Sequence, residues 1–206
     1  MTERSSGANG ETLPPLIVGM GGTTRSNSST EKVIRLVLEA AAAAGARTIQ
    51  FGGPQLMLPM YDPEKAERCE AARHLIETLR SADAIVIGSP GYHGGISGLV
   101  KNALDYTEDM ARDGRVYIDG MPVGCVGTGA GWQGANATLA ALRTVTHSLR
   151  GWPTPLGIAV NTIEPVFAAD GTCLNSGLKA QAEMMAGQLL SFVRRDPLLV
   201  RRPALR

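Results

Sequence analysis

Short apolar runs alternate with amphipathic stretches along most of the chain. Runs of this length that end at glycine or polar residues are typical of buried strands in a parallel sheet. The run at 84–88 is the clearest, because β-branched residues fill it, and the run at 47–51 is the weakest. The predicted strands are Leu16–Met20, Arg47–Phe51, Ala84–Gly88, Pro122–Gly127 and Leu156–Val160.

Between these runs, apolar residues recur at helical spacing. The first such stretch can begin at a cap provided by Ser28, Ser29 or Thr30 and end at Gly45, as helices commonly do. Further helices are predicted over 64–80, over 97–111, around 139–149 and around 178–192. The apolar stripe of the last helix could form a seam with another helix, but we expect it to cover the sheet. That stripe consists of Leu178, Ala182, Met185, Leu189 and Phe192.

Strands that are each followed by a helix, or by a loop leading to one, predict a parallel sheet with right-handed crossovers. No internal repeat or linker divides the chain. We therefore predict one α/β domain over residues 14–195, with a doubly wound sheet covered by helices on both faces. Residues 1–13 are expected to be a disordered leader, and residues 196–206 a C-terminal tail.

Composition narrows the choice of partners and compartment. The 206 residues include 20 Lys and Arg against 19 Asp and Glu, so the chain lacks the charge that binding to nucleic acid or an anionic membrane requires. Three distant cysteines without a CxxC pair argue against a zinc ribbon or a disulfide scaffold. No apolar stretch approaches the about 20 residues of a membrane span, and no secretory segment begins the chain. We expect a cytoplasmic protein.

Glycine-rich loops follow the first, third and fourth predicted strands. The carboxyl ends of parallel strands meet at one edge of a sheet, and doubly wound sheets bind ligands where the winding reverses direction. The convergence of these loops is the most informative feature of the sequence.

The loop over residues 21–29 combines glycines with serine and threonine hydroxyls just before a helix. A phosphate placed there would accept hydrogen bonds from free N–H groups at the positive end of the helix dipole. Arg25 adds a forked cation that suits phosphate oxygens. The alternative is an ordinary capping loop. The GxxxxGK[ST] pattern of a Walker loop is absent.

The loop Ser89–Gly95 contains features that suit a flat ligand. Pro90 should stiffen the turn, and glycines 94 and 95 would let backbone amides approach a ring closely. Tyr92 and His93 could cover the ring or form hydrogen bonds with its edge. The alternative for His93 is a surface position without a role.

Three segments together resemble the NAD(P)H-dependent FMN reductases: GTTRSNS (22–28), LPMYDPE (58–64) and SPGYHGGISGLVKNALDY (89–106). The resemblance runs from about Leu16 to about Val160. It implies a flavodoxin-like fold of five parallel strands in the order 2-1-3-4-5, FMN as cofactor, and NADPH or NADH as hydride donor. It also implies a homodimer or homotetramer, with the helix over 97–111 at a subunit interface.

Matched position by position, the resemblance implies three groups of binding residues. The FMN phosphate would be held by Thr23, Arg25, Asn27 and Ser28. The isoalloxazine ring would be lined by Pro90, Tyr92, His93, Gly94 and Gly95. Its other edge would face Thr128, Gly129 and Ala130. No catalytic side chain and no metal are expected, because the flavin itself carries the hydride chemistry.

Two positions depart from the family pattern. Gly91 stands where many members carry glutamate, so a charged group beside the nicotinamide is not implied here. Thr23 stands where serine is commoner, but threonine keeps the hydroxyl.

Residues 129, 131 and 134 match GxGxxG, but this motif indicates dinucleotide binding only after the first strand and with an acidic residue about 20 positions later. Here it follows the fourth predicted strand, and WPTPLG occupies the stretch where the acid would lie. We interpret it as a loop packed near the flavin. Trp132 could form a wall of the substrate cleft or serve only in packing.

The implied function is hydride transfer from NAD(P)H to FMN, followed by electron delivery to an acceptor. Reduced flavin could pass to a flavin-dependent monooxygenase, or retained FMN could reduce quinones, azo compounds or metal oxyanions. A non-enzymatic carrier like flavodoxin is disfavoured by the neutral charge balance, because flavodoxins are usually strongly acidic. A third alternative is an interaction protein that binds no flavin.

Overall fold

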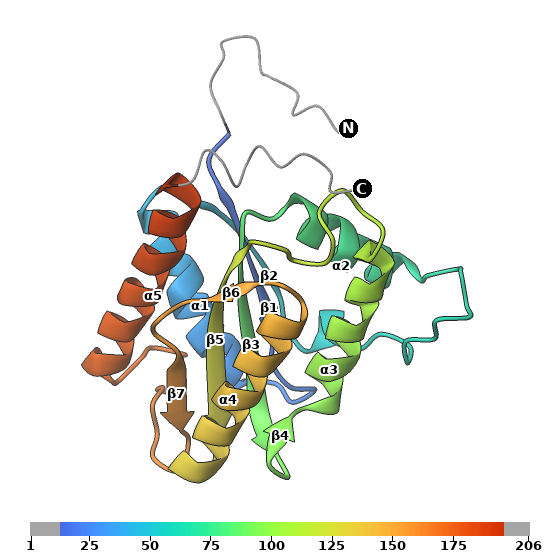
Figure 1. The fold of residues 1–206 in the computed structure, drawn as a ribbon. Coiled ribbons are helices and arrows are strands. Elements are labelled where there is room, and N and C mark those ends of the chain that lie inside the picture. The colour runs from blue at the N-terminus through green and yellow to red at the C-terminus, as the bar shows by residue number, and fades with distance from the viewer. Residues whose placement is uncertain (1–12, 196–206) are drawn as a thin grey trace.

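The computed structural model describes residues 13–195 (Figure 1). One sheet runs in the order β2-β1-β3-β5-β6, and β7 also pairs with β5. The short strands β6 and β7 together take the place of the fifth predicted strand, so the predicted order 2-1-3-4-5 is confirmed. The parallel strands are β1 Leu16–Gly21, β2 Arg47–Phe51, β3 Ala84–Tyr92, β5 Pro122–Gly129, β6 Trp152–Pro153 and β7 Ile158–Asn161.

Helices cover both faces of this sheet, as Figure 1 shows. On one face, α1 (Ser29–Ala43) and α5 (Ser176–Arg195) bury Ile17 of β1 in an apolar core. On the other face, α2 (Glu70–Ser81), α3 (Gly98–Asp105) and α4 (Trp132–Ser148) bury its neighbour Val18. Successive strand residues point to opposite faces, so a strand buried on both sides must be continuously apolar.

The apolar stripe of α5 covers the sheet, as expected from the sequence. Four of its five residues are buried with the strands and α1, and Phe192 is partly exposed against Trp152. A Cβ added at Gly124 would lie 2.6 Å from the Met185 sulfur, so α5 packs directly on the backbone of β5. A seam with a second helix is not needed to explain this pattern.

Ser28 is the residue that caps α1. Its Oγ accepts a hydrogen bond from the Glu31 N–H at 3.3 Å. Gly45 follows the helix with φ +88°, a conformation that glycine adopts without strain, as predicted.

The predicted helix over 64–80 is wrong at its start, because α2 begins only at Glu70. The preceding segment is held by the guanidinium of Arg68, which donates to the carbonyl oxygens of Asp62 and Lys65. The same group forms a two-pronged contact with the carboxylate of Asp109, both distances being 2.8 Å. These contacts hold the chain in an irregular path that helical spacing alone could not reveal.

The predicted helix over 97–111 is also not continuous. The α-helix α3 ends at Asp105 and tightens into the 3-10 helix η2, Tyr106–Met110. Within η2, the hydroxyl of Thr107 donates to the carbonyl oxygen of Leu104 at 2.7 Å.

The fifth strand, predicted at Leu156–Val160, is divided into β6, which was not predicted, and β7, which begins only at Ile158. Residues 154–157 separate β6 from β7, and Pro155 has no N–H to donate to a neighbouring strand. The Thr154 hydroxyl instead donates to the carbonyl oxygen of Leu156 at 2.7 Å, and the Leu156 N–H donates to the Gln188 side chain at 3.0 Å. Side-chain bonds thus replace strand pairing over this short segment.

The expected leader and C-terminal tail lie outside the described residues, apart from the exposed Leu13. Among the helices of residues 13–195, none has the length and apolar character that crossing a bilayer would require.

Candidate functional site

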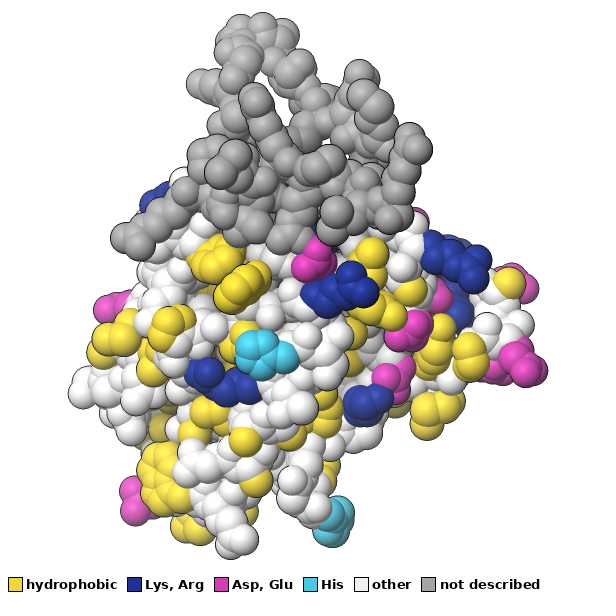
Figure 2. Space-filling view, in the orientation of Figure 1, with side chains coloured by type: hydrophobic (Ala, Val, Ile, Leu, Met, Phe, Trp, Pro, Cys, Tyr) yellow, Lys and Arg dark blue, Asp and Glu magenta, His cyan; other side chains and the backbone are white. Residues whose placement is uncertain are grey.

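The three expected binding segments are residues 23–28, 90–95 and 128–130. They lie side by side at the carboxyl edge of the sheet, the lower end in Figure 1. The strand register brings them together, because Gly21 pairs with Gly88 and Pro90 pairs with Thr128. Charged side chains are few at this end of the face shown in Figure 2, while both signs are mixed further up. The structure therefore confirms the predicted convergence of the loops.

The first segment leaves several donors free. The Thr23 hydroxyl accepts from the Arg25 N–H at 3.1 Å and so shapes the turn, while residues 24–27 are exposed. The guanidinium of Arg25 makes no hydrogen bond or ion pair with any residue in the range 13–195. Asn27 has φ +66°, a left-handed conformation that is uncommon outside glycine and often found at binding sites.

The start of α1 adds backbone donors to this segment. The N–H groups of Glu31 and Lys32 are bonded to the side chain and carbonyl of Ser28. Those of Ser29 and Thr30 have no acceptor within the described part of the chain. Unsatisfied N–H groups at a helix start are the usual donors to a bound anion.

Glycine is required where this segment meets the end of β2. Gly22 has φ +129°, and a Cβ there would lie 2.4 Å from Oε1 of Glu31. That carboxylate oxygen accepts from the Gly53 N–H at 3.0 Å. Glu31, which the sequence analysis did not single out, thus ties the first segment to the β2 end.

The second segment is a β-hairpin rather than the predicted loop from Ser89. β3 continues to Tyr92 and pairs in antiparallel fashion with β4 (Gly95–Ile96). His93 and Gly94 form the two-residue turn with φ +51° and +87°, and such a turn needs positive φ at both positions. Pro90 lies within β3 rather than in the turn, and pairing with β1 has already stopped at Gly88.

The hairpin presents accessible surface at its tip. Tyr92 is 48% exposed, and His93 and Gly94 are also exposed. A Cβ added at Gly94 or Gly95 would meet no other atom within 4 Å. The backbone there is open to a flat ligand.

Ser89 holds the base of the hairpin in place through two hydrogen bonds. It is fully buried, and its Oγ accepts from the Ser97 N–H and donates to the Pro90 carbonyl oxygen, both at 2.8 Å. Ser97 in turn caps α3 by accepting from the Val100 N–H. This positioning role was not recognised from the sequence.

The third segment is mostly strand. Thr128 and Gly129 end β5 and are buried, and only Ala130 is exposed. The Thr128 hydroxyl lies 2.7 Å from that of Thr30, inside the molecule. The Thr128 side chain is therefore held inside the molecule, and of this segment only Ala130 is exposed at the sheet edge.

The first glycine of GxGxxG, Gly129, serves close packing between β5 and α4, whereas a Cβ at Gly134 would meet no atom within 4 Å. A Cβ at Gly129 would lie 2.9 Å from the Ala135 nitrogen. The Gly131 N–H donates at 2.8 Å to Oδ1 of Asn161, which also accepts from the Ile163 N–H. Asn161 was missed, although a polar residue just after the fifth apolar run could have drawn attention to it.

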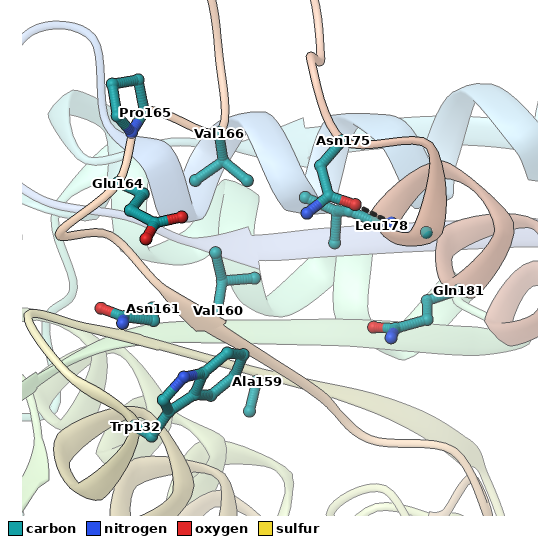
Figure 3. Close-up of a pocket in the computed structure, with 11 residues that line it drawn as sticks. Trp132, Ala159, Val160, Asn161, Glu164, Pro165, Val166, Asn175, Leu178 and Gln181 are labelled. Carbon is teal, nitrogen blue, oxygen red and sulfur yellow. Dashed lines mark hydrogen bonds between the residues drawn. The ribbon is translucent and has the colours of Figure 1, made fainter.

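Trp132 is not ordinary packing, because its side chain is 59% exposed. It forms one wall of a pocket of about 240 Å³ beside the end of β7 (Figure 3). The structure thus shows that Trp132 lines a hollow, and its role as a wall of the substrate cleft stays a prediction.

The segments 58–64 and 89–106 are bound to each other. Asn102 accepts from the Tyr61 N–H at 2.8 Å and donates to the Pro59 carbonyl oxygen at 2.9 Å. The Tyr106 hydroxyl donates to the same carbonyl at 3.0 Å. Burial is the main cause that raises the pKa of both tyrosines, whose rings lie 5.3 Å apart. Two of the three segments that carry the family resemblance, 58–64 and 89–106, thus form one structural unit.

Residues 15–164 match the family of NADPH-dependent FMN reductases. An FMN-dependent NADPH-azoreductase of Staphylococcus aureus is 28% identical over 183 residues, which cover 85% of this chain and 94% of that protein. One of Staphylococcus haemolyticus is 33% identical over 123 residues, covering 59% of this chain and 62% of that protein.

Solved structures share the fold. The flavoenzyme NAD(P)H:(acceptor) oxidoreductase FerB from Paracoccus denitrificans aligns with a TM-score of 0.66 and 23% identity, covering 87% of this chain and 96% of that one. A flavodoxin, the WrbA-like protein from Agrobacterium tumefaciens, aligns with a TM-score of 0.57 and 18% identity, covering 89% and 99%. The fold is flavodoxin-like.

Proposed function

The chain belongs to the family of NADPH-dependent FMN reductases, and from this premise we propose how its sheet edge works. It is an NAD(P)H-dependent flavin oxidoreductase with FMN as its cofactor. We propose that the edge retains FMN and passes electrons from NAD(P)H to an azo or quinone acceptor. The observation that supports this most is the juxtaposition of an open anion site at the α1 start with an exposed hairpin tip.

The phosphate end of FMN fits the first segment. Its oxygens would accept from the free N–H groups of Ser29 and Thr30 and from the guanidinium of Arg25. Thr23, Asn27 and Ser28 would shape the turn around it. An anion at a helix start is also stabilised by the helix dipole.

The ring end fits the hairpin. FMN, when bound, supplies the hydride chemistry, and the chain supplies position and exclusion of water. Tyr92, His93 and the open backbone of Gly94 and Gly95 would line the ring, with Pro90 beneath it. The third segment, Thr128–Ala130, would approach the other edge through its backbone and the exposed Ala130.

The close packing around Gly91 gives a physical reason why this chain has glycine where many family members carry glutamate. A Cβ there would lie 2.5 Å from the Thr138 hydroxyl and 2.9 Å from the Gly134 carbonyl oxygen, both in α4. A glutamate would require α4 to move. We propose that nicotinamide binding here uses no charged group at this position.

Two further features of the protein are proposals. Its three free cysteines fit the reducing cytoplasm.

Assembly as a homodimer or homotetramer would cover Met57 and Met60, which are 64% and 80% exposed in the segment bound to α3. Light scattering that finds only a 21.6 kDa species would contradict assembly.

An absorbance titration tests the function. The protein should take up FMN, and anaerobic NADPH should then bleach the flavin, with an azo or quinone compound restoring the colour. Failure to take up FMN would favour an interaction protein that binds no flavin. Uptake without bleaching would favour an electron carrier. Release of reduced flavin on dilution would instead favour delivery to a flavin-dependent monooxygenase.

A further inference from the structure

The pocket beside Trp132 lies outside the segments assigned to FMN. It is enclosed by β7, by the chain that leaves β7 and by the first turns of α5 (Figure 3). Val160, Val166 and Leu178 contribute apolar walls, but more of its accessible lining is polar than apolar. In Figure 3 the carboxylate of Glu164 and the amide of Gln181 point toward this interior from opposite sides.

The exposed indole of Trp132 provides a flat surface at the pocket wall. Ile163, which is not among the lining residues, is also 68% exposed, and its Cδ1 lies 4.0 Å from the Cβ position of Gly131, the residue before Trp132. Large exposed apolar residues gathered at a hollow are typical of a ligand site. An aromatic ring can stack on the indole face, which also attracts cations.

The charge of the pocket selects among ligands. Glu164 is the one ionisable residue among those that line it, and its carboxylate makes no hydrogen bond or ion pair with the rest of residues 13–195. No lysine, arginine or histidine lines the walls to neutralise an anion. The pocket therefore disfavours phosphates, sulfonates and carboxylates, and favours amines and amidinium groups.

Its position links the pocket to the proposed flavin site. On the sheet, Val160 pairs with Thr128 and Asn161 pairs with Gly129, so the pocket wall adjoins the third binding segment. At about 240 Å³ it is smaller than the about 300 Å³ at which sites for whole drug-sized ligands begin, so it suits one end of a larger molecule.

We propose that this pocket binds the aromatic, amine-bearing end of the electron acceptor, by stacking on Trp132 and by ionic contact with Glu164. This inference rests on the proposed function, because it assigns an anchoring site to the acceptor of that reaction.

Calorimetric titration of the FMN-loaded protein with benzamidine and benzoate tests the inference. The two probes are close in shape and opposite in charge. Benzamidine should bind about fivefold more tightly than benzoate, as expected for one charge contact with an exposed carboxylate. Glu164→Gln should remove this preference, and Trp132→Ala should weaken binding of benzamidine by a similar factor.

Matched variants serve as controls. Glu183→Gln removes an exposed carboxylate from α5, and Trp152→Phe changes another exposed tryptophan, neither of which lines the pocket. Both should leave the two affinities unchanged. Equal binding of both probes, or a preference that survives Glu164→Gln, would overturn the inference. FMN uptake is measured separately by absorbance, so its failure would count against the proposed function instead.

Discussion

The hydroxyl oxygens of Thr30 and Thr128 lie 2.7 Å apart in the interior, although 98 residues separate them in the chain. Thr30 belongs to the first turn of α1 and Thr128 to the end of β5. This hydrogen bond fixes the proposed phosphate end of the site relative to the proposed ring edge. A shift of either element would change the spacing that a bound FMN has to match.

Thr30→Val should lower the free energy of unfolding by about 1 to 3 kcal/mol, because it leaves the buried Thr128 hydroxyl without its partner. Adding Thr128→Val should cause little further loss, since no hydroxyl then remains unpaired. Urea denaturation of the two single variants and the double variant measures this. Strictly additive losses would show that the two hydroxyls are not coupled.

Arg25→Ala should weaken FMN binding at least tenfold and leave riboflavin binding nearly unchanged, because riboflavin lacks the phosphate. Arg35→Ala, an exposed arginine on α1, is the matched control and should alter neither. Fluorescence titration with both flavins measures the affinities. An equal loss for FMN and riboflavin would show that Arg25 does not contact the phosphate.

Gly94→Ala should lower the free energy of unfolding by about 1 kcal/mol, because φ +87° is strained for a residue with a Cβ. Gly94→Asn should lower the free energy of unfolding by less, since asparagine tolerates the left-handed region. Thermal unfolding of the apoprotein measures both. Equal stability of the alanine variant and the native chain would argue against this turn geometry.

Stability should fall as the pH rises above about 10, because burial raises the pKa of Tyr106 in the folded state. A raised pKa makes ionisation harder in the folded chain than in the unfolded one. The stabilisation is therefore complete below the unfolded pKa and is lost as the pH passes the folded one. Tyr106→Phe should flatten the decline of the urea midpoint between pH 9 and 11. An unchanged decline would exclude Tyr106 as its source.

Much of the fold could be predicted because it depends on local pattern. The strand at 47–51 and the Ser28 cap follow from apolar spacing and side-chain chemistry near each element. The start of α2 could not be predicted, because it depends on the contact of Arg68 with Asp109, 41 residues away. The strand β6 was missed because it is only two residues long and Pro155 separates it from the apolar run that marked β7.

The candidate site was predictable in its location but not in its construction. Glycine-rich loops after buried strands pointed to the correct sheet edge. The His93–Gly94 turn was missed because this pair is not one of the Asn-Gly, Asp-Gly or Gly-Gly pairs that typically mark a two-residue hairpin turn. Asn161 was missed because its role depends on two backbone groups that the fold brings to it.

A crystal structure of the protein with FMN tests the central claim most directly. We predict that the phosphate lies against the N–H groups of Ser29 and Thr30 and the guanidinium of Arg25. The ring should then rest on the hairpin from Tyr92 to Gly95. Density for the phosphate at any other place, or a sheet edge without FMN at saturating concentration, would contradict the account.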